Sequence, residues 1–363
     1  MDFALHVPIN SVSFGAASVS LLREFFLKGY EPVIFPIGNQ IDLSAQRIEQ
    51  EFGAWLTRCL NKSLSTYKRK TPVVKLWHLN GSLESFGEKQ ILYTFHELDS
   101  LTREEINIAK NNNKVILSSK FSVRNFEDHG IDNTVYIPLG FDKFNFYVKN
   151  KPFFIDNRVT WNLSGKWEAR KMTAKIIKAW NKKYGKNPKH FLTCAIFNPH
   201  LKPEDNNGFF NFCVDGNKPF NIDFLGFMQT NEMYNDYLNS GSIAIGMSGA
   251  ESFDLPLFHS VALGKHAVVL NAHVYKDYCN KENAVMVNPT GKEIAEDNIF
   301  FKRGTPFNQG NWFTWNEDEF IAGLEEAANR FESNPVNENG LKLQNEYTYS
   351  NTADKILEVL RDV

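Results

Sequence analysis

The stretch between residues 243 and 270 constrains the fold of this chain most, because an apolar strand, a tight turn, a helix and a second apolar strand follow one another there. Glu251 stands in the turn, and Pro256 falls in the first turn of the helix, where proline is tolerated. The start of such a helix offers unpaired backbone N–H groups and a positive dipole end to an anion. Glu251 can accept hydrogen bonds from polyol hydroxyls bound beside it. The stretch therefore predicts a site for a phosphate next to a sugar.

The length of the chain and the order of its apolar segments favour two α/β domains. Single hydrophobic cores stop growing at roughly 250 to 300 residues, and this chain has 363 residues, 42% of them hydrophobic. Residues Phe3 to Val7 read as a strand, Ala16 to Lys28 as an amphipathic helix, and Pro32 to Phe35 as the next strand. Alternation of strand and helix predicts doubly wound parallel sheets.

The cysteine content indicates a cellular compartment for the protein, whereas the net charge does not indicate a binding partner. The formal net charge of -2 gives no overall attraction to nucleic acid or to an anionic membrane. The four cysteines form no C-x-x-C pair, which favours reduced cytosol. The N-terminus lacks signal-peptide features, and no apolar run approaches the roughly 20 residues of a membrane span. We therefore expect a cytoplasmic protein without a transmembrane segment, and the oligomeric state stays open.

The turn and helix after residue 247 resemble the E-x7-E signature of retaining glycosyltransferases with the GT-B fold, the glycosyltransferase 4 group. The matching residues are Ser248, Glu251, Phe253, Leu255, Pro256, Leu257, Ala262 and Gly264. His259 stands where that family has its second glutamate. In the family the first glutamate contacts the donor sugar and the second contacts the nucleotide ribose. The resemblance therefore implies that Glu251 orients the sugar, and we expect the His259 imidazole to bond a ribose hydroxyl instead.

Other segments resemble the first domain of this family in matching order. His96 follows an expected strand at Ile91 to Phe95, as does the histidine that approaches the donor sugar in the family. Gly15 lies in the first loop, where the family's glycine lets the backbone approach the donor. The segment 135–146, VYIPLGFDKFNF, resembles the family's last strand and turn of the first domain, so an interdomain linker is expected at 147–158.

The second domain is expected to supply the cations that hold the donor diphosphate. Gly165, Lys166, Arg170 and Lys171 resemble the family's G-R-x-x-x-x-K-G motif, whose two cations neutralise the diphosphate. Lysine replaces the first arginine of that motif, which keeps the charge and loses the bidentate geometry. We find no D-x-D motif near a strand end, so we expect no metal. Gly226 resembles the glycine of a turn in this family whose backbone groups face the nucleotide base.

The resemblance implies a GT-B fold, an α/β architecture of two Rossmann-like doubly wound domains that face a central cleft. The expected division is 1–150 for the acceptor domain, 158–340 for the nucleotide-sugar domain, and 341–363 for a C-terminal helix that crosses back to the first domain. The implied activity is a metal-independent, retaining transfer of a hexose from a nucleotide diphosphate sugar, expected to be a UDP-sugar, to an acceptor hydroxyl on a glycan, lipid or small molecule. No cofactor is expected. The expected catalytic residues are His96, Lys166, Lys171 and Glu251, and the expected donor-binding residues are Gly15, Gly165, Arg170, Gly226, Ser252, Phe253, Asp254, Leu255 and His259.

Three alternatives stay open at the level of sequence. A hydrolase or epimerase of the same fold would use a similar site. A non-catalytic GT-B-like binding subunit would explain why a histidine stands at position 259. A phage-type DNA glucosyltransferase acting on a hydroxymethylated base would need phosphate contacts, which Lys68, Arg69 and Lys70 could make. Nucleic acid is not the favoured partner, and the donor sugar and the acceptor remain unidentified.

Overall fold

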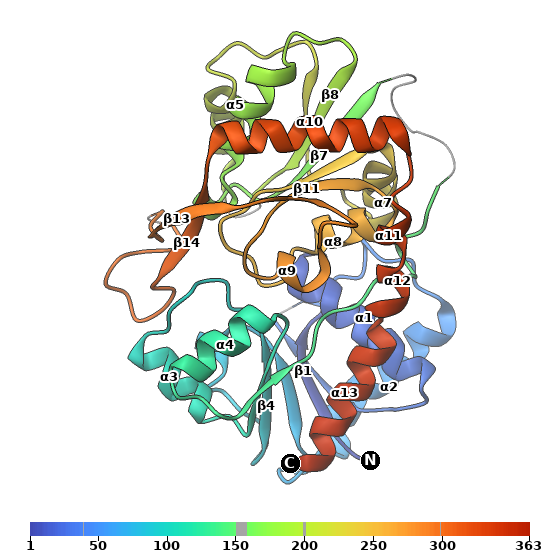
Figure 1. Cartoon of the computed structure of the whole chain (residues 1–363). Coiled ribbons are helices and arrows are strands. Elements are labelled where there is room, and N and C mark those ends of the chain that lie inside the picture. The colour runs from blue at the N-terminus through green and yellow to red at the C-terminus, as the bar shows by residue number, and fades with distance from the viewer. Residues whose placement is uncertain (39, 150–157, 199–200, 298) are drawn as a thin grey trace.

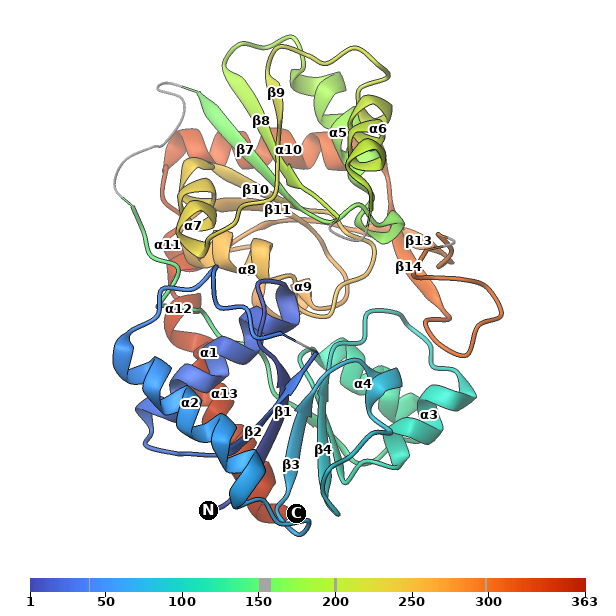
Figure 2. The ribbon, with the colours of Figure 1, turned by 180° about the vertical axis from the view of Figure 1, so that it is seen from behind.

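The computed structural model describes residues 1–38, 40–149, 158–198, 201–297 and 299–363. Two six-stranded sheets, flanked by helices, form two lobes (Figures 1 and 2). Every pairing within the two sheets is parallel. The predicted α/β architecture of two doubly wound domains is therefore confirmed.

The first sheet has the strand order β2-β1-β3-β4-β5-β6. Its strands are β1 (Ala4–Pro8), β2 (Val33–Ile37), β3 (Val73–Leu76), β4 (Gln90–Thr94), β5 (Lys114–Leu117) and β6 (Thr134–Tyr136). The order of the strands reverses beside β1, and ligands of open α/β sheets bind outside the carboxyl ends of strands at such a point.

The second sheet has the order β12-β11-β10-β7-β8-β9, so its reversal lies between β7 and β10. Its strands are β7 (Val159–Gly165), β8 (His190–Ile196), β9 (Ile222–Leu225), β10 (Ile243–Gly246), β11 (His266–Leu270) and β12 (Val285–Val287). The carboxyl ends of β7 and β10 carry the two motifs on which the sequence prediction rests.

Helices cover the sheets, which explains why strands such as β1 and β4 are buried at every position. The helices of the first domain are α1 (Ser13–Leu27), α2 (Gln50–Ser65), α3 (Arg103–Lys110) and α4 (Lys120–Asp128). Those that follow β7 are α5 (Thr173–Tyr184), α6 (Pro203–Cys213), α7 (Asn231–Ser240), α8 (Leu255–Ala262), α9 (Tyr275–Tyr278) and α10 (Glu317–Ser333). Short 3-10 turns lie at Leu79–Gly81 and Ala169–Lys171.

The end of the chain returns to the first lobe through α11 (Glu338–Leu341), α12 (Leu343–Glu346) and α13 (Tyr349–Asp362), and α13 lies beside α1 (Figure 1). The Phe141 N–H donates to the Tyr347 carbonyl at 2.8 Å. A side chain at Gly140 would place its Cβ 2.1 Å from the Tyr349 nitrogen, so only glycine allows this approach. We propose the domain division 1–150, 158–340 and 341–363, and most of the expected linker at 147–158 lies outside the described residues.

A two-stranded antiparallel hairpin, which the sequence did not predict, reaches from the second lobe to the first (Figures 1 and 2). It consists of β13 (Pro289–Ile294), β14 (Asn311–Trp315) and the described residues between them, and we call residues 289–297 and 299–315 the arm. Asp99 of the first domain accepts a hydrogen bond from the Asn311 N–H at 2.7 Å and pairs with Lys292 at 2.7 Å. Glu105 accepts from the Asn308 N–H at 2.9 Å. The arm therefore ties the two lobes together.

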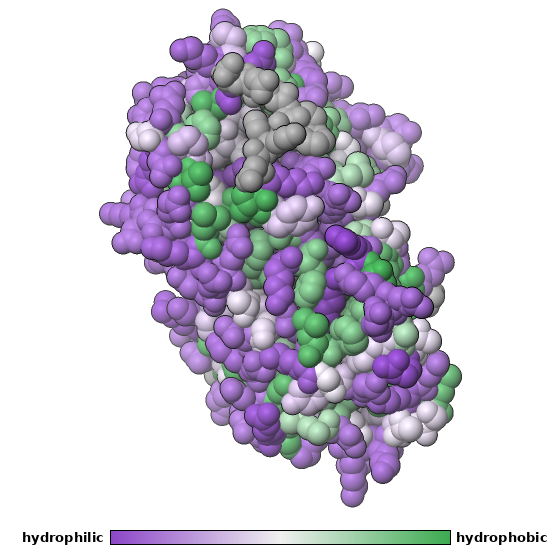
Figure 3. Space-filling view, turned by 90° about the vertical axis from the view of Figure 1, so that its right-hand side faces the viewer, coloured by the Kyte–Doolittle hydropathy of each residue, from purple (hydrophilic) through white to green (hydrophobic). Residues whose placement is uncertain are grey.

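The face of the molecule in Figure 3 is mostly hydrophilic, with hydrophobic residues in small separate groups. Among the described residues, no helix combines the length and the apolar character that crossing a membrane requires.

Candidate active site

A pocket lies between the two lobes, where segments that follow β1, β4, β7 and β10 face one another. It consists of two adjoining hollows of about 220 and 170 Å³. Both hollows are lined by Ser13, Gly165, Lys166 and Pro256. The smaller one also receives Glu97 from the first domain and Glu251 from the second. This is the position at which doubly wound sheets bind ligands.

Arg170, on the 3-10 turn after β7, is surrounded by three carboxylates. Its guanidinium lies 3.0 Å from Glu97, 2.7 Å from Glu168 and 3.0 Å from Glu251. It also donates to the Ala250 carbonyl at 2.6 Å. Because Glu97 belongs to the first domain, this ion-pair cluster crosses the cleft. The arginine is buried, so the carboxylates compensate a charge that would be costly to bury alone.

Glu251 is the carboxylate most firmly held in its ionised form. Its Oε1 atom contacts both Arg170 and the ammonium group of Lys171. Burial works against ionisation of this carboxyl, but the attraction of Arg170 and Lys171 is stronger and lowers the pKa of Glu251 to about 2. The floor of the pocket therefore presents an anionic hydrogen-bond acceptor directly beside two cations.

Glu97 has the opposite electrostatic character. Burial, opposed by Arg170 and reinforced by repulsion from Glu251, raises the pKa of Glu97 to about 7. Two carboxyl groups that share one arginine thus have pKa values far apart. One is a permanent anion, and the other can hold or release a proton near neutral pH, which is the usual requirement for acid–base work.

The segment from Ser252 to Leu255, which is expected to bind the donor, lines the smaller hollow together with Glu251. Asp254, which precedes α8, has a left-handed backbone (φ 61°), and its carboxylate accepts a hydrogen bond from the Tyr275 hydroxyl at 2.6 Å. Ser252 joins the lobes, since its side-chain oxygen lies 2.9 Å from that of Ser118 at the end of β5. These contacts fix the start of α8 against the pocket.

The predicted glycines lie at or near the pocket. Gly165 lines both hollows with a backbone φ of 155°, at the edge of the region that favours glycine. A Cβ at Gly15 would lie 2.2 Å from the Asn10 carbonyl oxygen, so α1 could not begin so close to the first loop with any other residue. Gly226 lines the larger hollow beside Phe227 and Tyr234. The expected contact of Gly226 with a nucleotide base stays a prediction.

His96 is not among the residues that line the two hollows, so the structure gives no support to its predicted catalytic role. Phe95 and Glu97 line the smaller hollow, whereas the ring of His96 packs against Phe126 at 5.3 Å. Burial lowers the pKa of His96 to about 4. Residues at alternate positions of an extended segment point to opposite sides, which explains why Phe95 and Glu97 line the hollow and His96 does not.

His259 is also turned away from the pocket, and the expected contact with ribose has no geometric support. Its Nε2 atom accepts a hydrogen bond from the Asp142 N–H at 3.3 Å, and its ring packs 4.3 Å from that of Phe146. Burial lowers the pKa of His259 to about 3. The imidazole is thus a neutral connection between α8 and the first domain.

A scan against protein-family models and a search of curated proteins by sequence found no match. Solved structures match along the whole chain. Sucrose-phosphate synthase from Thermosynechococcus elongatus superposes with a TM-score of 0.68 at 13% identity, covering 100% of this chain and 98% of that one. HepE of Anabaena, in complex with UDP and glucose, gives 0.69 at 12% identity with 100% of both chains covered. WaaG, a glycosyltransferase involved in lipopolysaccharide biosynthesis, gives 0.65 at 10% identity with 99% of both covered. Together with the two parallel sheets and the cleft between them, these likenesses show that the chain has the GT-B fold.

Proposed function

We propose that the protein is a retaining glycosyltransferase that moves a hexose from a nucleotide diphosphate sugar to a hydroxyl group of an acceptor. The observation that carries this proposal is the Glu251 carboxylate, which contacts Arg170 and Lys171 at the floor of the cleft pocket. A carboxylate can accept hydrogen bonds from sugar hydroxyls. Lys166 lines the same hollow and forms no ion pair in the described part of the chain, so its charge can attract a diphosphate. A site that places both next to each other suits a sugar joined to phosphate.

The cations support departure of the nucleotide diphosphate. As the bond between the sugar carbon and the phosphate oxygen breaks, negative charge builds on that oxygen. Lys166, Arg170 and Lys171 all line the pocket in which this happens. Preorganised donors of this kind are worth roughly 3 kcal/mol each in other enzymes. They can neutralise the diphosphate as a divalent metal would, so we propose that no metal is required.

In this proposal the configuration of the sugar carbon is retained, because the acceptor attacks that carbon on the same face from which the diphosphate leaves. The acceptor oxygen forms its bond to the sugar carbon on that face, and its proton passes to the departing β-phosphate oxygen. At the end of this step, the proton from the acceptor hydroxyl is bound to the β-phosphate oxygen on which the negative charge had formed. Glu97 enters the pocket from the first domain, and in this proposal Glu97, rather than His96, contacts the acceptor side of the sugar.

The expected donor is a UDP-sugar. HepE of Anabaena, which this chain resembles in fold, has been solved in complex with UDP, with UDP-glucose, and with UDP and glucose. The larger hollow beside Gly226 has aromatic and apolar walls that suit a nucleobase. We also propose the cytoplasm as the location, because all four cysteines are buried and unpaired.

The alternatives receive less support. A binding subunit was suggested by the histidine at position 259, but His259 bonds Asp142 and leaves the charged cluster around Glu251 complete. DNA as the acceptor rested on the short run from Lys68 to Lys70, and none of those residues lines either hollow of the cleft.

A ligand screen followed by product analysis tests the proposal. UDP-, GDP- and ADP-glucose and a CMP-sugar are each added to the full chain, and the unfolding temperature is measured. A donor present at 100 times its dissociation constant stabilises the protein by about 2.7 kcal/mol. The stabilising donor, labelled at the anomeric carbon, is then incubated with candidate acceptors in the presence of a chelator. We expect an α-linked product from an α-linked donor. Free sugar alone would instead indicate a hydrolase, and the absence of any stabilising nucleotide sugar would refute the proposal.

A further inference from the structure

A further pocket, of about 460 Å³, lies between the lobes at the start of α4, beside α9 and the arm (Figure 1). Pockets of roughly this size commonly bind a small molecule. In the described part of the chain, its lining residues differ throughout from those of the two cleft hollows. The nucleotide-sugar site proposed above therefore does not use this pocket.

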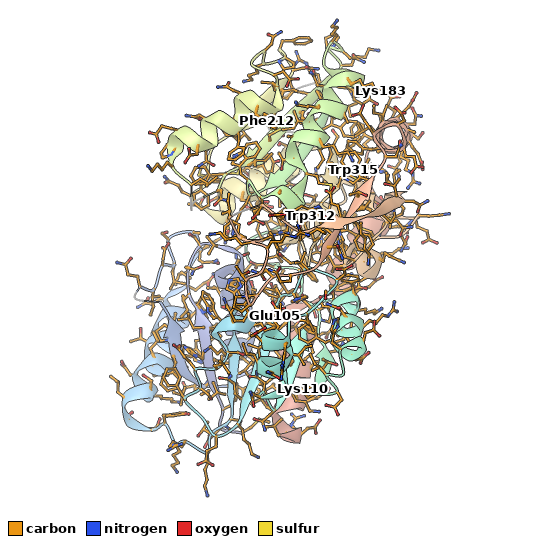
Figure 4. All side chains as sticks on the ribbon, turned by 90° about the vertical axis from the view of Figure 1, so that its left-hand side faces the viewer. Glu105, Lys110, Lys183, Phe212, Trp312 and Trp315 are labelled. Atoms are coloured by element: carbon orange, nitrogen blue, oxygen red, sulfur yellow. The ribbon has the colours of Figure 1, made fainter. Side chains whose placement is uncertain are left out.

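Both lobes contribute to the walls of the pocket. Phe121 of α4 comes from the first lobe and Phe313 of β14 comes from the second, and their ring centroids lie 6.0 Å apart. Figure 4 shows β14, marked by the labelled Trp312 and Trp315, in the second lobe above Glu105 of the first. A ligand in this pocket would therefore contact both lobes at once.

Three exposed cationic side chains line the pocket, namely Lys120 and Arg124 on α4 and Lys276 on α9. Lys120 lies over the Tyr136 ring, 5.6 Å from its centroid, a contact that does not neutralise its charge. In the described part of the chain, none of the three cations forms an ion pair. By contrast, Arg170 in the cleft is surrounded by three carboxylates. The charges of this pocket are therefore available to a ligand.

The acidic side of the pocket is weaker than its basic side. Among the described lining residues, Asp277 is the only carboxylate, and it already accepts a hydrogen bond from the Lys120 N–H at 2.8 Å. Burial raises the pKa of Asp277, and the attraction of the three cations opposes this increase. His273 adds no charge near neutral pH, because burial lowers its pKa to about 4. Three cations and one carboxylate leave a formal charge of +2, which favours an anionic ligand.

We propose that this pocket binds the phosphate group of a phosphorylated molecule, which Lys120 and Arg124 hold from the first lobe and Lys276 from the second. A phosphate monoester carries about two negative charges near neutral pH, so it balances the charge of the pocket. Arginine can bind two phosphate oxygens side by side, and lysine acts as a point charge. The rings of Phe121 and Phe313 suit the organic group that carries the phosphate. The inference goes beyond the proposed function, because the site is separate from the donor cleft and its ligand would join the lobes.

Calorimetric titration of the full chain with inorganic phosphate and with glucose 6-phosphate tests this proposal, and glucose is the neutral comparison. We expect both phosphates to bind with saturation and glucose not to bind. Arg124→Gln combined with Lys276→Gln should weaken phosphate binding at least tenfold, because this double variant removes two of the three cations. Both side chains are exposed, so the fold should persist. Lys166→Gln is the matched control: it removes a cation of the cleft and should leave the affinity for phosphate unchanged.

The phosphate group can belong to a free small molecule or to a lipid headgroup, and a separate assay distinguishes these two sources. Vesicles with and without phosphatidic acid are sedimented with the protein. Cosedimentation that requires both phosphatidic acid and the two cations removed in the double variant would assign the site to a lipid headgroup. Binding of glucose 6-phosphate without such cosedimentation would assign it to a free phosphorylated molecule.

Three results would overturn the proposal: no saturable binding of any phosphate-bearing probe, equal affinity of the double variant and the wild type, or a loss in Lys166→Gln as large as that in the double variant. Stabilisation by UDP-sugars is measured on the same proteins. It should be unchanged in the double variant and weaker in Lys166→Gln. Failure of this proposal and failure of the proposed transferase activity can therefore be told apart.

Discussion

The ionisation of the Glu97 carboxyl group should make the unfolding free energy depend on pH. Replacing Glu97 with glutamine should remove this part of the pH dependence. Burial, opposed by Arg170 and reinforced by Glu251, raises the pKa of this group from 4.5 to about 7. A folded-state pKa above the unfolded one means that the folded protein binds the proton more tightly. The contribution to stability is therefore complete below pH 4.5 and is lost as the pH rises to about 7 and beyond. At 1.36 kcal/mol per pKa unit, this loss is at most about 3 kcal/mol, because water still reaches part of the side chain.

Glu97→Gln keeps the shape of the side chain and an oxygen for Arg170, and it removes the ionisation. We expect the variant to match the wild type in unfolding free energy at pH 4.5 and to exceed it at pH 8 by up to about 3 kcal/mol. Urea denaturation at pH 4.5 to 8 measures this difference, and contributions from other groups cancel between the two proteins. A difference between the two proteins that stays constant over this pH range would refute the reasoning.

Three further substitutions test the site. Glu251→Ala should lower turnover at least a hundredfold while the fold persists, because it removes an acceptor matched to the sugar in the transition state; steady-state kinetics and circular dichroism check this, and near-normal turnover would contradict the assignment. Lys171→Ala should weaken binding of UDP far more than binding of uridine, as calorimetry can measure, whereas Lys183→Ala should change neither; equal losses for UDP and uridine would count against a diphosphate clamp. His259→Leu should leave donor affinity unchanged and lower the unfolding free energy by about 1 to 3 kcal/mol, because the buried Asp142 N–H loses its acceptor. A higher KM for the donor in this variant would instead support a contact between His259 and the ribose.

Sequence analysis predicted the fold because each level of the pattern agreed. Short apolar segments alternate with amphipathic helices, so parallel sheets covered on both faces were the consistent solution. The turn from Gly165 to Lys171 and the segment from Glu251 to Leu255 lie at the carboxyl ends of neighbouring strands, which the topology brings to one pocket. Residues that depend on local geometry and sheet order could therefore be selected from the sequence.

The two histidines could not be placed in this way. A strand covered on both faces shows no alternation of polar and apolar residues, so the sequence cannot tell whether His96 or Glu97 faces the cleft. His259 is on the expected helix, but the segment of the first domain that contacts that helix decides which groups its ring meets. The arm could not be predicted because its two short strands pair with each other and not with either sheet in the described part of the chain. In addition, the residues of the arm that contact Asp99 and Glu105 lie about 200 positions after them in the sequence.

The arm has a consequence for how the two lobes can move. The return of α13 to α1 joins the lobes on one side of the molecule, and the arm joins them on the other (Figures 1 and 2). Arg170 also contacts Glu97, and Ser252 contacts Ser118, so opening of the cleft must first break these smaller contacts between the lobes. Once they are broken, the lobes can rotate about the line through the two larger connections, but they cannot twist freely across that line. Opening of the cleft should thus be a rocking motion about one fixed axis. A ligand would then enter and leave only along the edges of the cleft that lie away from that axis.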